Sequence, residues 1–506
     1  MAAESVPMLL LISSLGIYIH ALFLSISLGF PWVIVSLLVS WWRTRDEHYF
    51  AAVKTATGVL GLNFALGAAT GTLVEFGLVQ AWPGSIFVIA TFGFIPLTLE
   101  LIAFVGEIVL LILFIVTLGK ARASGSIFIM SAYLAMAVLS GALITTVNSW
   151  LNVPWGTGSL ASNLYPFLPG YGPETANLGA LVQLKLELVR AFATSGSASQ
   201  VLQNAGLARS VGLALSDPYI AFLSPYNQAS ILHNVNAAMI VGVSIALVGY
   251  AHRYFKTGDF KYERILRAIL PVLFILLVVQ PFIFGDFMGK MVASNQPTKL
   301  ALMEGASTTR QNPLVGFLAY GDPSHPILGF ESFREWCNGL AGKTLDSLDL
   351  KQQCLSDLSR AEARLLVVNT AYYLKVAMGV VALVSLLGLE ATVFKLGILS
   401  KLVHRIFSRV HRTKLVFAFS FLVLAGAIAS SMLGWFVREG GRKPWTVYGI
   451  LHPEEIITAV SISPIVLFLF VLTFAGVATI GLVGMYVVAT RPLKFIELLR
   501  KGAGVE

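Results

Sequence analysis

Nine stretches of this chain are apolar over a length that can cross a bilayer as an α-helix. We expect these helices near residues 8–40, 52–79, 85–118, 126–151, 229–251, 266–289, 363–393, 414–437 and 460–490. Charged residues make up only 12% of the chain, against roughly 25% in a typical soluble domain. The sequence therefore predicts an all-α integral membrane protein with nine transmembrane helices. The pattern argues against a β-barrel, whose strands would be alternating segments of about 10 residues.

Lysine and arginine are concentrated in alternate loops, at residues 43–54, 120–122, 253–267, 395–414 and 491–501. Because short cytoplasmic loops carry an excess of these residues, the pattern predicts an amino terminus outside and a cytoplasmic carboxyl terminus. The net charge of +9 is thus a topology signal. With no basic soluble domain in the sequence, we expect no nucleic-acid partner.

The chain divides into five regions, 1–151, 152–228, 229–289, 290–362 and 363–506. The second and the fourth are long segments that we expect to lie outside. Cys337 and Cys354 both belong to the fourth. An outside location permits a disulfide between them, and two free thiols are the alternative.

Glu100 and Glu107 stand seven residues apart in the third apolar stretch. At 3.6 residues per turn they share one helix face, about 10 Å apart along the axis. Two carboxylates stacked along one face in a medium of low dielectric constant suit a proton relay. The alternative is a packing pair capped by serine or threonine.

Two histidines, His20 and His233, lie inside apolar stretches, where an unused imidazole is costly. Given the predicted topology, both fall in the outer half of the bilayer, together with Met378 and, at the membrane edge, Glu439. Imidazole and thioether are axial ligands of haem iron, so the shared depth favours an iron site. The alternative is that the histidines are hydrogen-bonded packing residues. The sequence has no CxxC or CxxCH motif, which argues against covalent haem attachment and a zinc ribbon.

The string WFVREGGRKPW at 435–445 is the most unusual local sequence. Trp435 suits the membrane interface, and Arg442 offers a forked donor for a carboxylate such as a haem propionate. For Arg438 and Lys443, the alternative is that their side chains snorkel to the interface.

Six strings, in order, resemble subunit I of the cytochrome bd-type quinol oxidases and cover most of the membrane region. They are GLNFALGAATGTLVEFG (61–77), PLTLELIAFVGE (96–107), NSWLNVP (148–154), QPTKLALMEG (296–305), YYLKVAM (372–378) and GWFVREGGRKPW (434–445). The order of all six is more specific than any single string. The family also has nine helices and an outside amino terminus.

The resemblance implies that the chain holds three haems. His20 and Glu439 match ligands of two high-spin haems, with His20 at the oxygen-reducing centre. One of these haems is b-type, and the other is either haem d or a further b-type haem. His233 and Met378 match the two axial ligands of a low-spin haem b.

The resemblance also implies roles in proton and quinol handling. Glu100 and Glu107 match carboxylates that deliver protons, although they stand one residue closer than in the family pattern. Lys299 and Glu304 match a pair that binds quinol in the external loop, which is here of the shorter kind. The segment 155–222 looks like an insertion.

Arg442 and Trp435 match residues around the haems, whereas two nearby positions depart from the family pattern. The arginine expected ten residues before the ligand histidine is Leu10 here. The arginine expected two residues before the haem methionine is Val376, with Lys375 one place earlier. Both changes bear on how haem propionates are neutralised, and they indicate a divergent member.

The resemblance thus implies a haem-containing subunit of a membrane quinol oxidase. The enzyme would oxidise quinol on the outer side and reduce oxygen to water with cytoplasmic protons, without pumping protons. It implies a prokaryotic cytoplasmic membrane and a second multi-helix subunit, with a small single-helix subunit as an open question. Two alternatives are a haem-bearing electron-transfer subunit without oxygen reduction and a proton-coupled transporter. A transporter would not need His20, Glu439, Glu100, His233 and Met378 together.

Overall fold

The computed structural model of the protein describes residues 2–153, 224–339, 341–342, 344–345, 348–449, 452–455 and 463–490. Among these residues, nine helices are long and apolar enough to cross a membrane, which confirms the predicted all-α architecture. The segment 155–222, which resembles an insertion, lies outside the described residues.

Within the described residues, all but one of these spans are single helices. They are α1 (Ala2–Thr44), α2 (Glu47–Ala81), α3 (Pro83–Thr117), α4 (Ala123–Asn152), α10 (Pro225–Thr257), α17 (Leu365–Phe394), α19 (Arg412–Gly440) and α20 (Pro464–Thr490).

The remaining span is interrupted. α11 (Phe260–Val279) runs into a π-helical turn, η1 (Gln280–Gly285), and α12 (Asp286–Asn295) continues beyond it. Pro281 lies at the start of this turn, where it removes a backbone donor and disfavours the regular α-helical hydrogen bonds. The apolar pattern predicts one uninterrupted helix here, because hydropathy does not register a change in helical pitch.

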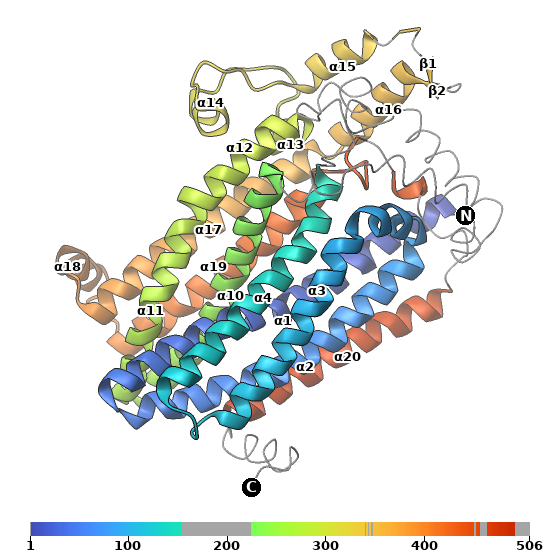
Figure 1. Ribbon diagram of the computed structural model, residues 1–506. Helices are drawn as coiled ribbons and strands as arrows, with labels where there is room; N and C mark the ends of the chain where they lie inside the picture. The colour runs from blue at the N-terminus through green and yellow to red at the C-terminus, as the bar shows by residue number, and fades with distance from the viewer. Residues whose placement is uncertain are drawn as a thin grey trace.

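Two groups of helices make up the bundle (Figure 1). In the first, α1 contacts α2, α4 and α10, while α3 lies on α4 and α20 lies on α2. In the second, α17 and α19 pack along each other, α19 against α10 and α17 against α11. Buried aliphatic side chains from both groups form the shared core, among them Ile34, Leu37, Leu247, Leu270 and Leu386. α10 therefore joins the two groups.

α1 and α10 cross at two glycines that leave no room for a side chain. A Cβ atom on Gly29 would lie 2.5 Å from the Cα atom of Gly242, and one on Gly242 would lie 1.9 Å from the carbonyl oxygen of Ser25. The helices run in the same direction (Figure 1). Accordingly, Tyr250 near the end of α10 donates to the carbonyl of Ala52, just beyond the α1–α2 turn, at 3.2 Å.

This crossing sets the depth of the two membrane histidines. His20 precedes Gly29 by nine residues, and His233 precedes Gly242 by nine residues. Because the helices are parallel, both histidines lie about 14 Å from the crossing, towards the same end of the bundle. The sequence places both histidines in the same half of the bilayer, and the fold adds that they lie at equal depth.

Short elements gather at that end (Figure 1). They are α13 (Pro297–Glu304), α14 (Pro313–Tyr320), α15 (Phe330–Asn338), β1 (Thr344–Leu345), β2 (Leu348–Asp349) and α16 (Leu350–Glu362). The two strands pair antiparallel. Cys337 and Cys354 form a disulfide between α15 and α16, which decides between the two alternatives for the cysteines. We call these short elements, from α13 to α16, the cap. A disulfide needs an oxidising compartment, so it supports the outside location predicted for the cap.

A buried carboxylate holds the opposite end, where α18 (Gly397–Ile406) also lies. Glu263 of α11 is fully buried and accepts hydrogen bonds from Arg412 of α19 at 2.6 and 2.9 Å and from Arg267 at 2.7 Å. Arg412 also donates to the carbonyl of Thr392, near the end of α17, at 3.1 Å. The network ties three helices together on the side predicted to be cytoplasmic.

Candidate functional site

His20 is held by the neighbouring helix α2. Its Nδ1 atom lies 3.1 Å from the hydroxyl oxygen of Thr70, and that hydroxyl donates to the carbonyl of Leu66 or Gly67, each at 3.0 Å. A hydroxyl whose proton is used there accepts from Nδ1–H, and the Nε2 lone pair of the ring is then free. A Cβ atom on Gly71 would lie 3.0 Å from the Cε1 atom of the ring. This arrangement favours the tautomer that a haem ligand needs, with the ring packed closely against Gly71 of α2.

His233 is held by the π-helical turn. The Gln280 side-chain nitrogen lies 3.2 Å from Nδ1, 3.5 Å from Nε2 and 3.1 Å from the carbonyl oxygen of His233. Asn236, one turn further along α10, donates to the Gln280 side-chain oxygen at 2.7 Å and to the Leu276 carbonyl at 2.9 Å. Gln280 therefore fixes the ring and is itself fixed.

The orientation of the Gln280 amide decides which ring nitrogen of His233 is available. As it stands, the amide nitrogen donates to Nδ1. Iron binding through Nε2 needs the ring proton on Nδ1, with an acceptor beside it. The amide would then turn its oxygen to the ring and give up the bond from Asn236. His233 fits an iron ligand, but only with this rearrangement of its partner.

Met378 lies half-buried on α17. Lys375, one turn earlier on the same helix, is an electrostatic neighbour of His233, so this part of α17 faces the His233 region. Within the described residues, no ion pair involves the Lys375 ammonium. A thioether and an imidazole are a donor pair that fits a low-spin haem iron, and an unpaired cation nearby fits its propionates.

Glu439 lies in the last turn of α19 and is held from two sides. Arg442 forms an ion pair with its Oε2 atom, and Asn148 of α4 donates to Oε1 at 3.2 Å. Among the described residues each oxygen has one partner and keeps a further lone pair, so the carboxylate can still bind iron. Tyr18, two residues before His20, is an electrostatic neighbour of Glu439. The part of α1 that carries Tyr18 and His20 therefore lies near the end of α19.

Lys299 lies on α13, with its side chain across the turn that follows α19. It is 2% exposed, and its ammonium donates to the Gln296 side-chain oxygen at 3.3 Å. A Cβ atom on Gly441 would lie 2.8 Å from the Lys299 Cγ atom. Burial, and then the charge of Arg438, lower the pKa of Lys299 well below its usual range.

Glu304 ends α13 and meets α17. It accepts a hydrogen bond from the Tyr373 hydroxyl at 2.9 Å, and the Arg310 guanidinium donates to its backbone carbonyl. Burial raises the pKa of the Glu304 carboxyl, against the opposing effect of the tyrosine. The carboxyl can therefore take up a proton closer to neutral pH than an exposed glutamate.

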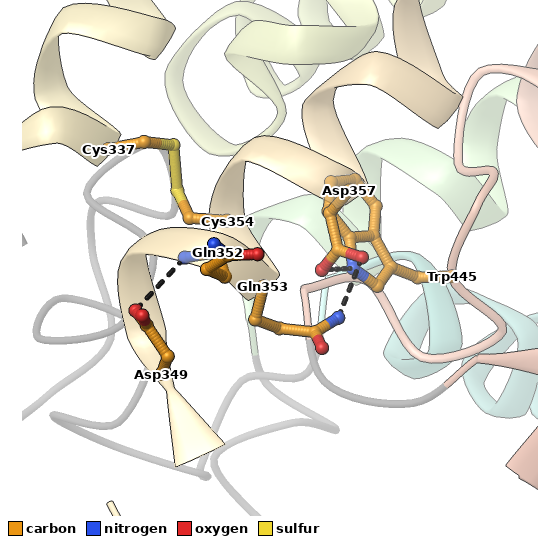
Figure 2. Close-up of a disulfide and its surroundings, with 7 residues drawn as sticks. All are labelled: Cys337, Asp349, Gln352, Gln353, Cys354, Asp357 and Trp445. Carbon is orange, nitrogen blue, oxygen red and sulfur yellow. Dashed lines mark hydrogen bonds between the residues drawn. A yellow bond between two sulfur atoms is a disulfide. The ribbon is translucent and has the colours of Figure 1, made fainter. Parts of the chain in front are cut away.

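The cap anchors the turn that follows α19 (Figure 2). Asp357 of α16 is fully buried and accepts hydrogen bonds from Trp445 Nε1 at 3.1 Å and from Gln353 Nε2 at 2.9 Å. His452 Nε2 lies 2.7 Å from the same carboxylate. The disulfide is one turn earlier on α16, so the cross-linked cap fixes the turn that carries Arg442.

Glu100 and Glu107 lie on α3, where it packs against α4. Ser140 of α4 donates to the Glu100 Oε1 atom at 3.0 Å, as expected of a capped packing pair. Glu107 is buried and is an electrostatic neighbour of both Glu100 and Tyr133. A hydroxyl group can also pass protons between carboxylates, so the contact between Ser140 and Glu100 suits a proton relay as well.

Four polar residues hold the predicted iron ligands in place, and the sequence alone did not single them out: Thr70, Gln280, Asn236 and Asn148. Thr70 and Asn148 belong to strings that resemble family motifs, but neither carries a charge. The signal that could have found all of them is a polar side chain within an apolar stretch. Trp435, which the sequence did select, lies under the Arg438 guanidinium, 5.6 Å from its ring centroid.

Comparisons with known proteins agree over nearly the whole chain. The family model described as cytochrome bd terminal oxidase subunit I matches residues 11–493. The chain is 22% identical over 478 residues to the putative cytochrome bd menaquinol oxidase subunit I of Bacillus subtilis (strain 168), covering 92% of each. Its fold resembles the solved structure of bd oxidase from Geobacillus thermodenitrificans, with a TM-score of 0.67, 18% identity, and 97% of this chain and 98% of that chain covered.

Proposed function

The chain belongs to the cytochrome bd terminal oxidase subunit I family, and on this premise we propose roles for its residues in quinol oxidation and oxygen reduction. It is a haem-containing, multi-pass membrane subunit of a quinol oxidase, and subunits of this family work with a second subunit. We further propose that the subunit holds one low-spin haem b and two high-spin haems. It lies in a prokaryotic cytoplasmic membrane with its amino terminus outside. A small single-helix subunit is a further candidate partner.

The observation that carries the proposal is the contact between α13 and the turn after α19. The Lys299 side chain lies against Gly441, two residues beyond Glu439. Residues expected to bind quinol therefore adjoin a residue expected to bind iron. This adjacency supports a short electron path near the outer end of the bundle.

Lys299 and Glu304 bind the quinol hydroxyls in this proposal. The Glu304 carboxylate takes up a quinol proton, because its raised pKa brings it nearer to the pH at which a base works best. Tyr373 orients that carboxylate through its hydroxyl. Haems bound by His20, Glu439, His233 and Met378 supply the one-electron transfer that links quinol oxidation to oxygen reduction.

Glu107 and Glu100 move protons along α3 from the cytoplasmic side. Ser140 holds Glu100 in place from α4. Protons that enter from the cytoplasm and electrons that enter from the outer side separate charge across the membrane without a pump. The relay therefore needs both carboxylates on one helix face, which the seven-residue spacing gives.

The test uses the complex purified from its own membrane with any co-purifying subunits. We expect haem bands in a reduced-minus-oxidised spectrum and quinol-dependent oxygen uptake. Haem bands without oxygen uptake would favour the electron-transfer alternative. A preparation without haem would overturn the assignment of all four ligand residues.

A further inference from the structure

The turn after α19 concentrates positive charge in the interior. Lys299, Arg438, Arg442 and Lys443 are 2%, 6%, 4% and 9% exposed. Glu439 is the carboxylate among them, paired with Arg442. The alternative that Arg438 and Lys443 snorkel to the interface is wrong, because both side chains are buried.

Many donors of these cations are unused. The Nε atoms of Arg438 and Arg442 are buried and have no hydrogen-bond partner. In the part of the chain that the structure describes, Arg438 has one side-chain hydrogen bond, to the Ser149 hydroxyl at 3.3 Å. The Lys443 ammonium has none there. Glu454, which acts on Lys443 from a distance, is already paired with Arg360.

Four basic side chains surround one carboxylate, so three of them have no carboxylate partner among the described residues. Taking charges out of water is costly unless they are paired and hydrogen-bonded. Accordingly, burial and then the Arg442 charge lower the pKa of Lys443 to about 7. The site therefore suits an anionic ligand with more than one carboxylate, which guanidinium groups bind in a forked geometry.

These cations differ in which of the two proposed iron ligands, His233 or Glu439, they act on. Arg438 is a neighbour of His233 and also of Glu439. Lys443 acts on Glu439 and is not among the groups that act on His233.

We propose that Arg438 and Lys443 bind haem propionates, with Arg438 shared between the haem at His233 and the haem at Glu439, and Lys443 confined to the latter. This rests on the proposed function, since it takes both residues as iron ligands. A cation beside a propionate stabilises the reduced haem, because reduction removes one positive charge from the iron. The two variants should therefore differ in which haem responds.

The experiment compares Arg438→Gln, Lys443→Gln and the charge-preserving Arg438→Lys and Lys443→Arg in the purified complex. Haem per protein is measured, and each spectral component is titrated against potential. Arg438→Gln should lower the midpoint potentials of the low-spin and one high-spin component, or cause loss of those haems. Lys443→Gln should affect the high-spin component alone. Arg334→Gln, an exposed cation of the cap, is the control.

Each other outcome counts against the proposal. Full haem content with unchanged potentials in both glutamine variants would overturn it. Loss of haem in Arg438→Lys as severe as in Arg438→Gln would overturn it too, because packing and not charge would then hold the site. A wild-type complex without haem would instead overturn the proposed function from which the inference starts.

Discussion

The two membrane histidines lie at equal depth in very different surroundings. Among the described residues, the polar partners of His20 are the Thr70 hydroxyl and the backbone of Gly67, and neither is charged. His233 touches Gln280, which Asn236 fixes in turn, and it has cations near it. The same ligand chemistry is therefore placed once beside few, uncharged polar groups and once among several hydrogen bonds and cations.

The difference fits two different tasks at iron. An imidazole with an available Nε2 lone pair and uncharged surroundings suits a site where a small neutral molecule must bind, as proposed for oxygen at His20. A ring held by several hydrogen bonds suits an electron-transfer site, because little has to move when the charge changes.

The largest effect is expected from the glycine crossing that both sites share. Gly242→Leu would drive a side chain into α1, where even a Cβ atom would lie 1.9 Å from the Ser25 carbonyl. Overpacking of this kind costs about 1–3 kcal/mol or more, and we expect loss of haem at both sites. Gly249→Leu is the matched control, since no atom lies within 4 Å of a Cβ there. Equal haem content in the two variants would contradict the idea that the crossing of α1 and α10 supports both haem sites.

Removal of the ligands should separate the sites. His233→Ala or Met378→Leu should abolish the low-spin signal and spare the high-spin bands. His20→Ala should abolish oxygen uptake while the low-spin haem still becomes reduced by quinol. His404→Ala, at an exposed position on α18, is the control. A low-spin signal that survives in Met378→Leu would show that the ligand assignment is wrong.

The spans and the histidine depth could be predicted because hydropathy and loop charge report them directly. The surroundings of the histidines could not. Thr70 and Gln280 are uncharged, and their importance depends on which helix faces which, information that one sequence does not contain. Arg438 and Lys443 looked like interfacial cations for the same reason, since a local string does not reveal that the folded chain buries them.

A smaller effect is expected from the hydrogen-bond partners of the two ligands. Partners of this kind are typically worth about 10–100-fold in metal affinity or activity. Thr70→Val removes a single contact with His20, and Gln280→Leu removes three contacts with His233. The Gln280 variant should therefore lose more haem, and only at the low-spin site.

Two further variants check this comparison of partners. Thr72→Val removes a hydroxyl that is bonded within its own helix, and it should leave both haems unchanged. Gln280→Glu supplies an acceptor for Nδ1–H without the amide turning, so it should retain the haem and lower the low-spin potential. A low-spin haem that tolerates Gln280→Leu with an unaltered spectrum would remove Gln280 from the site.

The smallest effect should come from Lys375, whose charge acts on only one of the histidines. It is an electrostatic neighbour of His233 and is not among the groups that act on His20. Lys375→Gln removes a charge that favours the reduced low-spin haem, and we expect its midpoint potential to fall by tens of millivolts, where about 59 mV is tenfold for one electron. The oxygen-binding component should not move, and Lys375→Arg should restore the wild-type value. Equal shifts at both histidine sites would mean that the apolar surroundings of His20 do not insulate it, and the contrast between the two environments would then be one of hydrogen bonding alone.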